Sequence, residues 1–242
     1  MEAYGTAAGL QKVPLYEQVA NLLESQILNQ LEDGDLLPSE QQLAEQFLVS
    51  RAIIREAQKL LKERGLLDSK AGKGTYVKRL HAQDIAVVFS RLIRMERIDY
   101  ISVFDMRNIL EVEAVARASQ NATPEELEKM AEMLDKLKEP SLSEIQYSEY
   151  DFSFHYMIAK ASGNPLLAIM TEAIGSLCRQ IISRAVQTRG GVEDALWRHE
   201  LILKMLYEQN EAGAREAMRG HLDKSLENYQ QYLEHLSDEQ KV

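Results

Sequence analysis

Between residues 15 and 64 the apolar positions recur three or four residues apart, the spacing of one face of an α-helix. Such a stripe over Leu15 to Gln30 predicts a first helix. A second helix is expected to begin after Ser39, because Gln42 completes a Ser-x-x-Gln capping box. Ser50 is the cap expected for a third helix. The pattern therefore predicts a helix, then two further helices separated by a tight turn.

The pattern changes after Gly65, a residue typical of the position just past a helix end. Leu66–Ser69 and Thr75–Lys78 have the length and composition of short strands. The segment Ala71–Gly74 between them is rich in glycine, so we expect a two-stranded hairpin with this segment as its tip.

From Ile85 onward the sequence shows only helical periodicity. Short polar or glycine- and proline-containing breaks divide it into expected helices at 85–95, 100–119, 124–137, 141–161, 166–186, 192–208 and 212–236. Val88, Leu92 and Ile93 are the apolar positions of the first of these helices. We therefore predict a mainly α protein, with a winged helix-turn-helix of three helices and a two-stranded wing before an antiparallel bundle of about seven helices.

This pattern divides the chain into four parts. We expect a loose arm at 1–11, a winged helix-turn-helix at 12–79, a junction at 80–84 and a helical effector-binding and dimerisation domain at 85–236.

Composition narrows the class of protein. The 242 residues are 45% hydrophobic and 27% charged, and no apolar run approaches the ~20 residues that span a bilayer, so we expect a cytoplasmic protein without membrane contact. Cys178 is the single cysteine, which excludes an intrachain disulfide, and its apolar neighbours favour a buried thiol.

Charge is distributed unevenly along the chain. The whole chain carries −10, whereas residues 51–79 hold nine lysines and arginines against three acidic residues, a local balance of +6. A basic helix beside a basic hairpin tip suits a DNA duplex, with the helix in the major groove. A solvated basic face is the alternative interpretation.

The N-terminal motifs resemble those of the GntR-type bacterial transcription regulators. The match consists of L-P-S-E-x-x-L-A at 37–44, V-S-R at 49–51, R-E-A-x-x-x-L at 55–61 and G-K-G-T-Y-V at 72–77. The resemblance implies DNA contacts from Gln41, Arg51, Ala52, Ile53, Arg55, Gly72 and its wing neighbour Lys73. Gln41, Ala52 and Ile53 depart from the residues usual in the family, so the operator of a relative does not transfer to this chain.

A second candidate site lies in the helical half. Asp151 and His155 are four residues apart on one expected helix, and His199 and His221 lie within apolar stripes of two later helices. Four such groups can converge on one metal ion in the core of a bundle. Histidines buried in the core without a metal are the alternative, and spacing alone does not decide between them. His81 and His235 have no such neighbours, and we expect a junction residue and a surface residue.

This half resembles the all-helical FCD effector domain of the FadR branch of GntR regulators, and the resemblance implies that Asp151, His155, His199 and His221 bind a metal. It also implies that Arg107, in the motif R-x-x-L-E, holds the carboxylate of an effector, with Arg179 and Arg184 as weaker candidates. The alternative for Arg107 is a surface ion pair with Glu111. Three imidazoles and a carboxylate suit a divalent transition metal, Zn²⁺ first, then Ni²⁺, Fe²⁺ or Mn²⁺.

Three functions are compatible with these residues. The first is a ligand-responsive transcription regulator, by default a repressor, in which a homodimer binds a palindromic operator and a small organic acid changes its affinity. The second is a metal-dependent hydrolase, although no HExxH motif, nucleophile elbow or phosphate loop is present. The third keeps the regulator fold but has a structural metal and a lipid or acyl-CoA effector. We expect the first.

Overall fold

The computed structural model describes residues 13–70, 72–79, 82–188 and 190–239. The expected arm at 1–11 and the junction residues Leu80 and His81 lie outside these ranges. The chain forms two compact units, Met1–His81 and Ala82–Val242, and each is treated separately below.

The N-terminal unit is a winged helix-turn-helix. Its helices are α1 (Leu15–Gln30), α2 (Glu40–Phe47) and α3 (Arg51–Glu63). The capping box predicted for Ser39 and Gln42 begins α2, and the Ser50 hydroxyl accepts from the backbone of Ile53 to begin α3. Both caps are confirmed.

The turn between α2 and α3 contains a feature that the sequence did not reveal. Leu48 ends α2 with φ of 55°, in the left-handed region that usually favours glycine or asparagine. Its side chain is 91% exposed, so nothing in the core requires a leucine at this position.

The wing consists of β1 (Leu67–Lys70) and β2 (Gly74–Val77), paired antiparallel. Leu67 pairs with Val77 and Lys70 with Gly74, so the paired segments lie one residue nearer the tip than Leu66–Ser69 and Thr75–Lys78. Gly74 has φ of 103°, a conformation that side-chain-bearing residues rarely adopt, which explains the need for glycine.

The N-terminal unit has its own core, which the predicted apolar stripes supply. The α1 stripe packs against the inward face of α3 and the base of the wing, through Val19, Leu23, Ile27, Ile54, Ala57, Leu61, Leu67 and Val77. The opposite face of α3 is therefore free for another partner.

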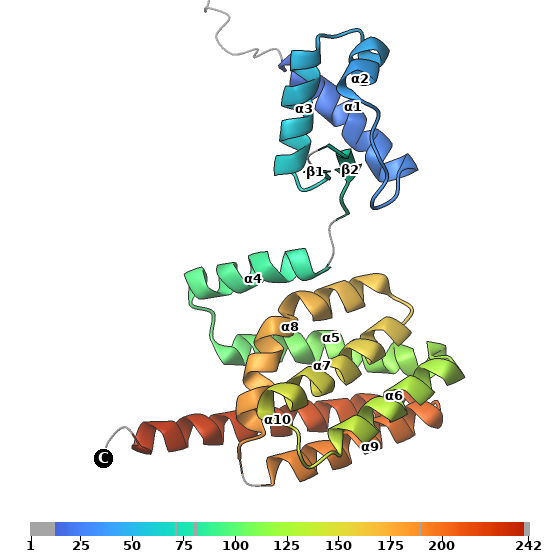
Figure 1. The fold of residues 1–242 in the computed structure, drawn as a ribbon. Helices are drawn as coiled ribbons and strands as arrows, with labels where there is room; N and C mark the ends of the chain where they lie inside the picture. Colours follow the sequence, from blue (N-terminus) through green and yellow to red (C-terminus); the bar gives the residue numbers. More distant parts are fainter. Residues whose placement is uncertain (1–12, 71, 80–81, 189, 240–242) are drawn as a thin grey trace, which may run out of the picture. The chain divides into compact units, whose positions relative to one another are not determined.

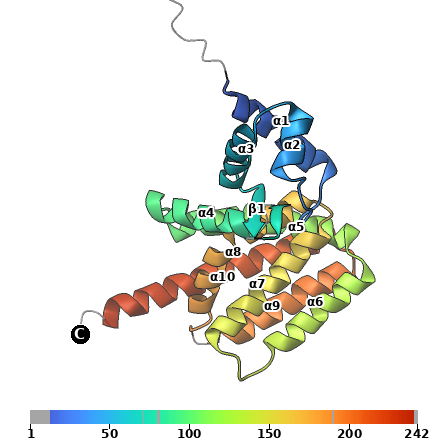
Figure 2. The same ribbon diagram turned by 45° about the horizontal axis from the view of Figure 1, so that its top comes forward.

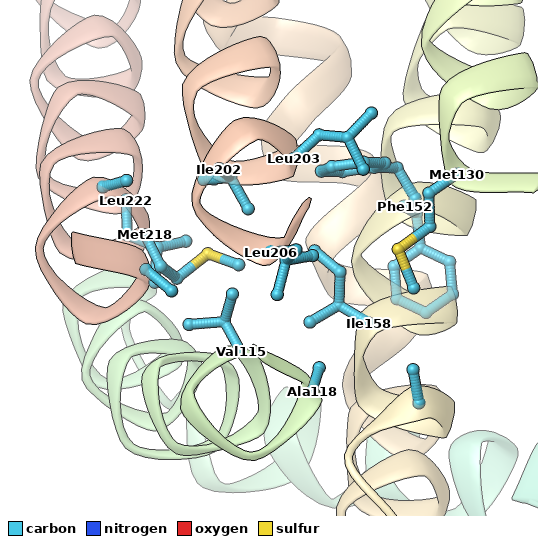
Figure 3. Close-up of a cluster of buried hydrophobic side chains, with 14 of the residues drawn as sticks. Val115, Ala118, Met130, Phe152, Ile158, Ile202, Leu203, Leu206, Met218 and Leu222 are labelled. Atoms are coloured by element: carbon cyan, nitrogen blue, oxygen red, sulfur yellow. The ribbon is translucent and has the colours of Figure 1, made fainter. Parts of the chain in front are cut away.

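The C-terminal unit is a bundle of seven described helices, as predicted (Figures 1 and 2). They are α4 (Ala82–Glu96), α5 (Tyr100–Asn121), α6 (Pro124–Leu137), α7 (Glu144–Ala161), α8 (Pro165–Ala185), α9 (Gly191–Tyr207) and α10 (Glu211–Glu239). Helix α10 packs along α5 and α9, while α7 packs against α5, α6 and α8. Figure 3 shows the core in which side chains of α5, α6, α7, α9 and α10 meet.

Most helix boundaries in this unit differ from the expected ones by one to three residues. The cap of α7 is Ser143, whose hydroxyl accepts from the backbone of Gln146 in a capping box, so the predicted start at 141 was wrong. Helix α4 begins at Ala82, three residues before the expected Ile85. Its apolar residues Val88 and Leu92 are exposed.

Among the described residues no single helix is both long enough and apolar enough to span a membrane. The two arms of α8, Pro165–Gly175 and Leu177–Ala185, meet these two criteria only together, and the helix bends by 64° between them.

Candidate DNA-binding surface and metal centre

The outer face of α3 presents the basic residues that the sequence singled out. Arg51, Ala52 and Arg55 are exposed, and Gln41 is exposed on α2. Ile53 is half-buried against the core of this unit, so part of its side chain is unavailable to a base. Gly72 and Lys73 are exposed at the tip of the wing. Helix and wing thus each present the residues expected to meet DNA.

Glu40 is an acidic residue beside this surface, and it lies outside residues 51–79, over which the local charge was counted. Its Oε2 lies 3.6 Å from Arg51 Nη2 and 3.5 Å from Arg55 Nη1. The arginine side chains are 62% and 56% exposed, so water screens both pairs and they contribute little to stability. The carboxylate holds the two guanidinium groups at the start of α3, beside Gln41.

The four predicted metal ligands come together inside the helical unit. Asp151 and His155 lie one turn apart on α7, His199 on α9 and His221 on α10, and all four are at most 4% exposed. One ligand atom from each residue lies within 4.8 Å of the others. Spacing placed the first two on one face, but only the packing of three helices brings in the other two.

The distances fit a metal ion. Nε2 of His155 and Nε2 of His199 are 3.1 Å apart, and Nε2 of His199 is 3.3 Å from Oδ1 of Asp151. Tetrahedral coordination with bonds of about 2.1 Å places ligand atoms roughly 3.4 Å apart. Oδ2 of Asp151 is buried without a hydrogen-bond partner among the described residues, a desolvated oxygen that a cation would satisfy.

The protonation states of the buried histidines also favour metal binding. Burial, and then the positive charges of His155 and Arg107, hold the pKa of His199 well below 6.5, and burial does the same to the pKa of His221. Both imidazoles are therefore neutral at neutral pH, the form that binds metals. Burial raises the pKa of Asp151, which shows that its carboxylate lacks full compensation by the protein.

Arg107 is buried rather than at the surface. Its side chain is 1% exposed, its Nε donates to Glu111 Oε1 at 2.7 Å, and Nη1 has no partner among the described residues. The alternative of a surface ion pair was wrong about location, because the pair with Glu111 exists but lies in the core. The predicted contact with an effector stays a prediction, and the Nη1 amino group, with two N–H donors, remains for such a ligand.

Glu111 connects this arginine to the metal cluster. Its Oε2 lies 2.7 Å from Nδ1 of His155, while Nε2 of the same ring faces His199 and Asp151. Burial alone would raise the pKa of Glu111, but the charges of Arg107 and His155 bring it down to about 2. A carboxylate on the outer nitrogen of a ligating histidine fixes the ring orientation in metal sites.

Arg179 and Arg184 each contact other side chains of this unit. Arg179 pairs with Glu149 at 3.3 Å and lies 4.4 Å from the centre of the Phe152 ring. Arg184 donates to the Tyr229 hydroxyl at 3.2 Å.

Cys178 is buried as predicted, and burial raises the pKa of its thiol to about 12.

A small cavity adjoins the metal cluster, and most of its polar residues were not predicted. Its polar lining consists of Asp151 and His221 of the cluster, Asp194 and Arg198 of α9, and Lys224, Ser225 and Asn228 of α10, and the other lining residues are apolar or glycine. Its volume is about 20 Å³. A signal was present in the sequence, because Lys224, Ser225 and Asn228 follow His221 by three, four and seven residues and so share its helix face.

Comparison with known proteins agrees with this architecture. Residues 15–77 match the family model described as bacterial regulatory proteins, gntR family, and residues 102–224 match the FCD domain. The HTH-type transcriptional regulator LutR of Bacillus subtilis is 31% identical over 198 residues, which cover 80% of this chain and 90% of that protein.

Two further proteins extend the comparison. The Glc operon transcriptional activator of Escherichia coli is 30% identical, over 69% of this chain and 68% of that protein. The solved structure of a GntR protein of Streptococcus agalactiae superposes with a TM-score of 0.71 at 26% identity, and the match covers 86% of this chain and 97% of that one. These relatives are regulators of transcription, which excludes the hydrolase interpretation. The chain therefore belongs to the GntR family of bacterial transcription regulators, with a DNA-binding winged helix-turn-helix followed by an FCD domain.

Proposed function

We propose that this regulator responds to a small organic acid that binds at a metal ion in the FCD domain. The observation that carries the proposal is that the cavity and the metal cluster share two residues. Asp151 and His221 belong to both, so a ligand entering the cavity lies against the metal. The ion supplies a Lewis acid for carboxylate oxygens, and the protein's own groups orient the acid around it.

The ligand set favours a transition metal over Mg²⁺ or Ca²⁺. Three imidazole nitrogens and one carboxylate suit Zn²⁺ first, with Ni²⁺, Fe²⁺ and Mn²⁺ as alternatives. We assign Asp151, His155, His199 and His221 as ligands, and Arg107 Nη1 as a further donor toward the acid. Arg179 is a weaker candidate, because its guanidinium group is engaged by Glu149 and Phe152.

The size of the cavity bears on the alternative effector. A volume of about 20 Å³ holds roughly one water molecule, and a short acid requires only side chains at the mouth to move. An acyl chain requires a cavity many times larger. A small acid is therefore the better proposal than acyl-CoA or lipid.

In DNA binding, we assign direct contacts with the bases to α3 and contacts with the DNA backbone to the wing. Arg51 and Arg55 would leave Glu40 to meet bases, with Gln41, Ala52 and the exposed part of Ile53 beside them. Gly72 and Lys73 would meet the backbone or minor groove. Two copies would read a palindromic operator, with recognition helices about 34 Å apart.

We assign dimerisation to the exposed face of α4. Val88, Leu92 and Met95 are spaced by four and three residues, and they are 62%, 45% and 79% exposed. An apolar helix face of this kind marks a surface that another protein surface covers. A second copy of this chain is the occupant that a palindromic operator requires.

The experiment combines metal, acid and operator. An operator is selected from random DNA, and its affinity is measured with metal-loaded and metal-stripped protein while short carboxylic acids are screened by thermal shift. We expect an acid that stabilises only the metal-loaded protein and changes operator affinity by 5- to 150-fold, the usual range of allosteric coupling. Repression relieved by the acid is the expected sign. Equal binding of acids to the metal-stripped protein would contradict the proposal.

A further inference from the structure

The side of the cavity away from the metal cluster contains a buried amide without hydrogen bonds. Asn228 is 8% exposed, and its side chain makes no hydrogen bond to any other described residue. The amide offers two N–H donors and one oxygen to whatever occupies the cavity.

The neighbours of Asn228 are mainly donors and cations. Lys224 lies one turn before it on α10, with Ser225 beside it, and Arg198 reaches the same cavity from α9. Asp194 neutralises Arg198 at 2.7 Å, and the Gly220 carbonyl accepts from its Nη1 at 3.1 Å. Lys224 contacts Glu227 at 2.9 Å, and Glu227 is not among the lining residues. The lining balances two cations, Arg198 and Lys224, against two carboxylates, Asp151 and Asp194. Because Asp194 pairs with Arg198 and Asp151 is assigned to the metal, Lys224 is the cation left for a second anionic group.

The start of α9 adds little to this preference. Gly191, the first residue of α9, lines the cavity, but its N–H donates to the Thr188 carbonyl at 2.9 Å. Glu193 and Asp194 already place negative charge in the first turn of the helix. The donors available to an anion at this end of the cavity are therefore the side chains of Lys224, Ser225 and Asn228.

We infer that the effector has two anionic ends, and that it is a short dicarboxylic acid. One carboxylate binds the metal at Asp151 and His221, and the second accepts hydrogen bonds from Lys224 and Asn228. This inference rests on the proposed function, which requires only one carboxylate. It makes Lys224 and Asn228 the residues that distinguish a diacid from a monoacid.

The side chains at the mouth set the length of the acid. Lys224 is 30% exposed and Arg198 24% exposed, and both are long side chains that can turn toward solvent. Their displacement would enlarge a cavity that now holds about one water molecule, so the test covers short acids of three to five carbons.

The test is calorimetric titration of the full-length, metal-loaded protein with matched pairs of acids. The pairs are malonate with propionate, succinate with butyrate, and glutarate with valerate. We expect at least one diacid to bind at least tenfold more tightly than its monoacid. In Lys224→Met and Asn228→Leu this preference falls below about threefold, while monoacid affinity and metal content stay unchanged.

Controls separate this inference from the proposed function. Lys204→Met removes a lysine of α9 that is 65% exposed and does not line the cavity, and it should leave the preference intact. Lys224 is partly exposed, so its variant tests the inference even if Asn228→Leu fails to fold. Equal affinities within every pair, or an unchanged preference in Lys224→Met, would overturn the inference alone. Binding of no acid to the metal-loaded protein would overturn the proposed function with it.

Discussion

Oε2 of Glu111 lies 2.7 Å from Nδ1 of His155, and its other oxygen accepts from Nε of Arg107 at the same distance. A buried guanidinium group, a carboxylate and a metal-binding imidazole thus form one chain of contacts from α5 to α7. Glu111 compensates the charge of Arg107 and orients the imidazole of His155. Removing the carboxylate affects both functions at once.

We predict that Glu111→Gln lowers metal affinity by about 10- to 100-fold, because His155 loses the group that orients it. The free energy of unfolding should also fall by about 3–5 kcal/mol, since the charge of Arg107 is left buried without a partner. Competition with a chelator and denaturant unfolding measure the two effects.

Two further variants separate these effects. Adding Arg107→Met to Glu111→Gln should restore stability but not metal affinity. Glu113→Gln, on the same helix but 38% exposed, should change neither. Unchanged metal affinity in Glu111→Gln would disprove an orienting role for this carboxylate.

Arg55 and Lys73 should affect DNA binding in different ways. Arg55→Ala should weaken operator binding by about 1–3 kcal/mol and relax discrimination at one position of the operator. Lys73→Ala should weaken binding to all sequences alike and reduce the salt slope by about one. Fluorescence anisotropy with the operator and its point variants separates these outcomes. If Arg55→Ala weakens binding to all DNA sequences equally, Arg55 contacts phosphate and not a base.

The apolar face of α4 gives a prediction about assembly. Leu92→Glu places a charge in the proposed dimer interface and should convert the protein to monomers, as measured by sedimentation velocity. Leu166→Glu, at a leucine of α8 that is 65% exposed, is the matched control and should not change the sedimentation coefficient. A Leu92→Glu protein that remains dimeric would place the interface elsewhere.

Low pH should destabilise the metal-free protein. The pKa values of His199 and His221 are below 6.5 in the folded state, so the unfolded chain takes up protons first as pH falls. Their contribution is fully present above pH 6.5 and is lost below it, by up to about 2.7 kcal/mol for the two groups over one pH unit.

Asp151 acts in the opposite direction, because its pKa is raised in the folded state and its protonation at low pH favours folding. Unfolding in denaturant at pH 6.5 and 5.5 should therefore be compared with the His199→Gln/His221→Gln variant, which isolates the two imidazoles. A wild-type loss of stability no greater than that of the variant would be evidence against buried neutral histidines.

The sequence predicted what depends on local spacing. The caps Ser39 and Ser50 and the pair Asp151 and His155 follow from residues three or four positions apart. The convergence of His199 and His221 on that pair required the resemblance, because helix packing, not periodicity, sets distances between helices. Burial of Arg107 could not be predicted for a similar reason, since an i,i+4 ion pair has the same sequence pattern at the surface and in the core.

Other features have no local signal. Leu48 adopts a left-handed conformation without glycine, and Val88 and Leu92 are apolar but exposed. Periodicity identifies an apolar face but not whether the same chain or another one covers it. The polar face of α10 at Lys224 and Asn228 had a pattern that could have been found by extending the helix spacing beyond His221.

The most direct test of a metal-dependent effector domain is elemental analysis of the purified protein beside the His199→Ala/His221→Ala variant. We predict about one transition-metal ion per wild-type chain and none in the variant, with both proteins folded by circular dichroism. No metal in the folded wild-type protein, even after incubation with Zn²⁺, Ni²⁺, Fe²⁺ or Mn²⁺, would contradict the account.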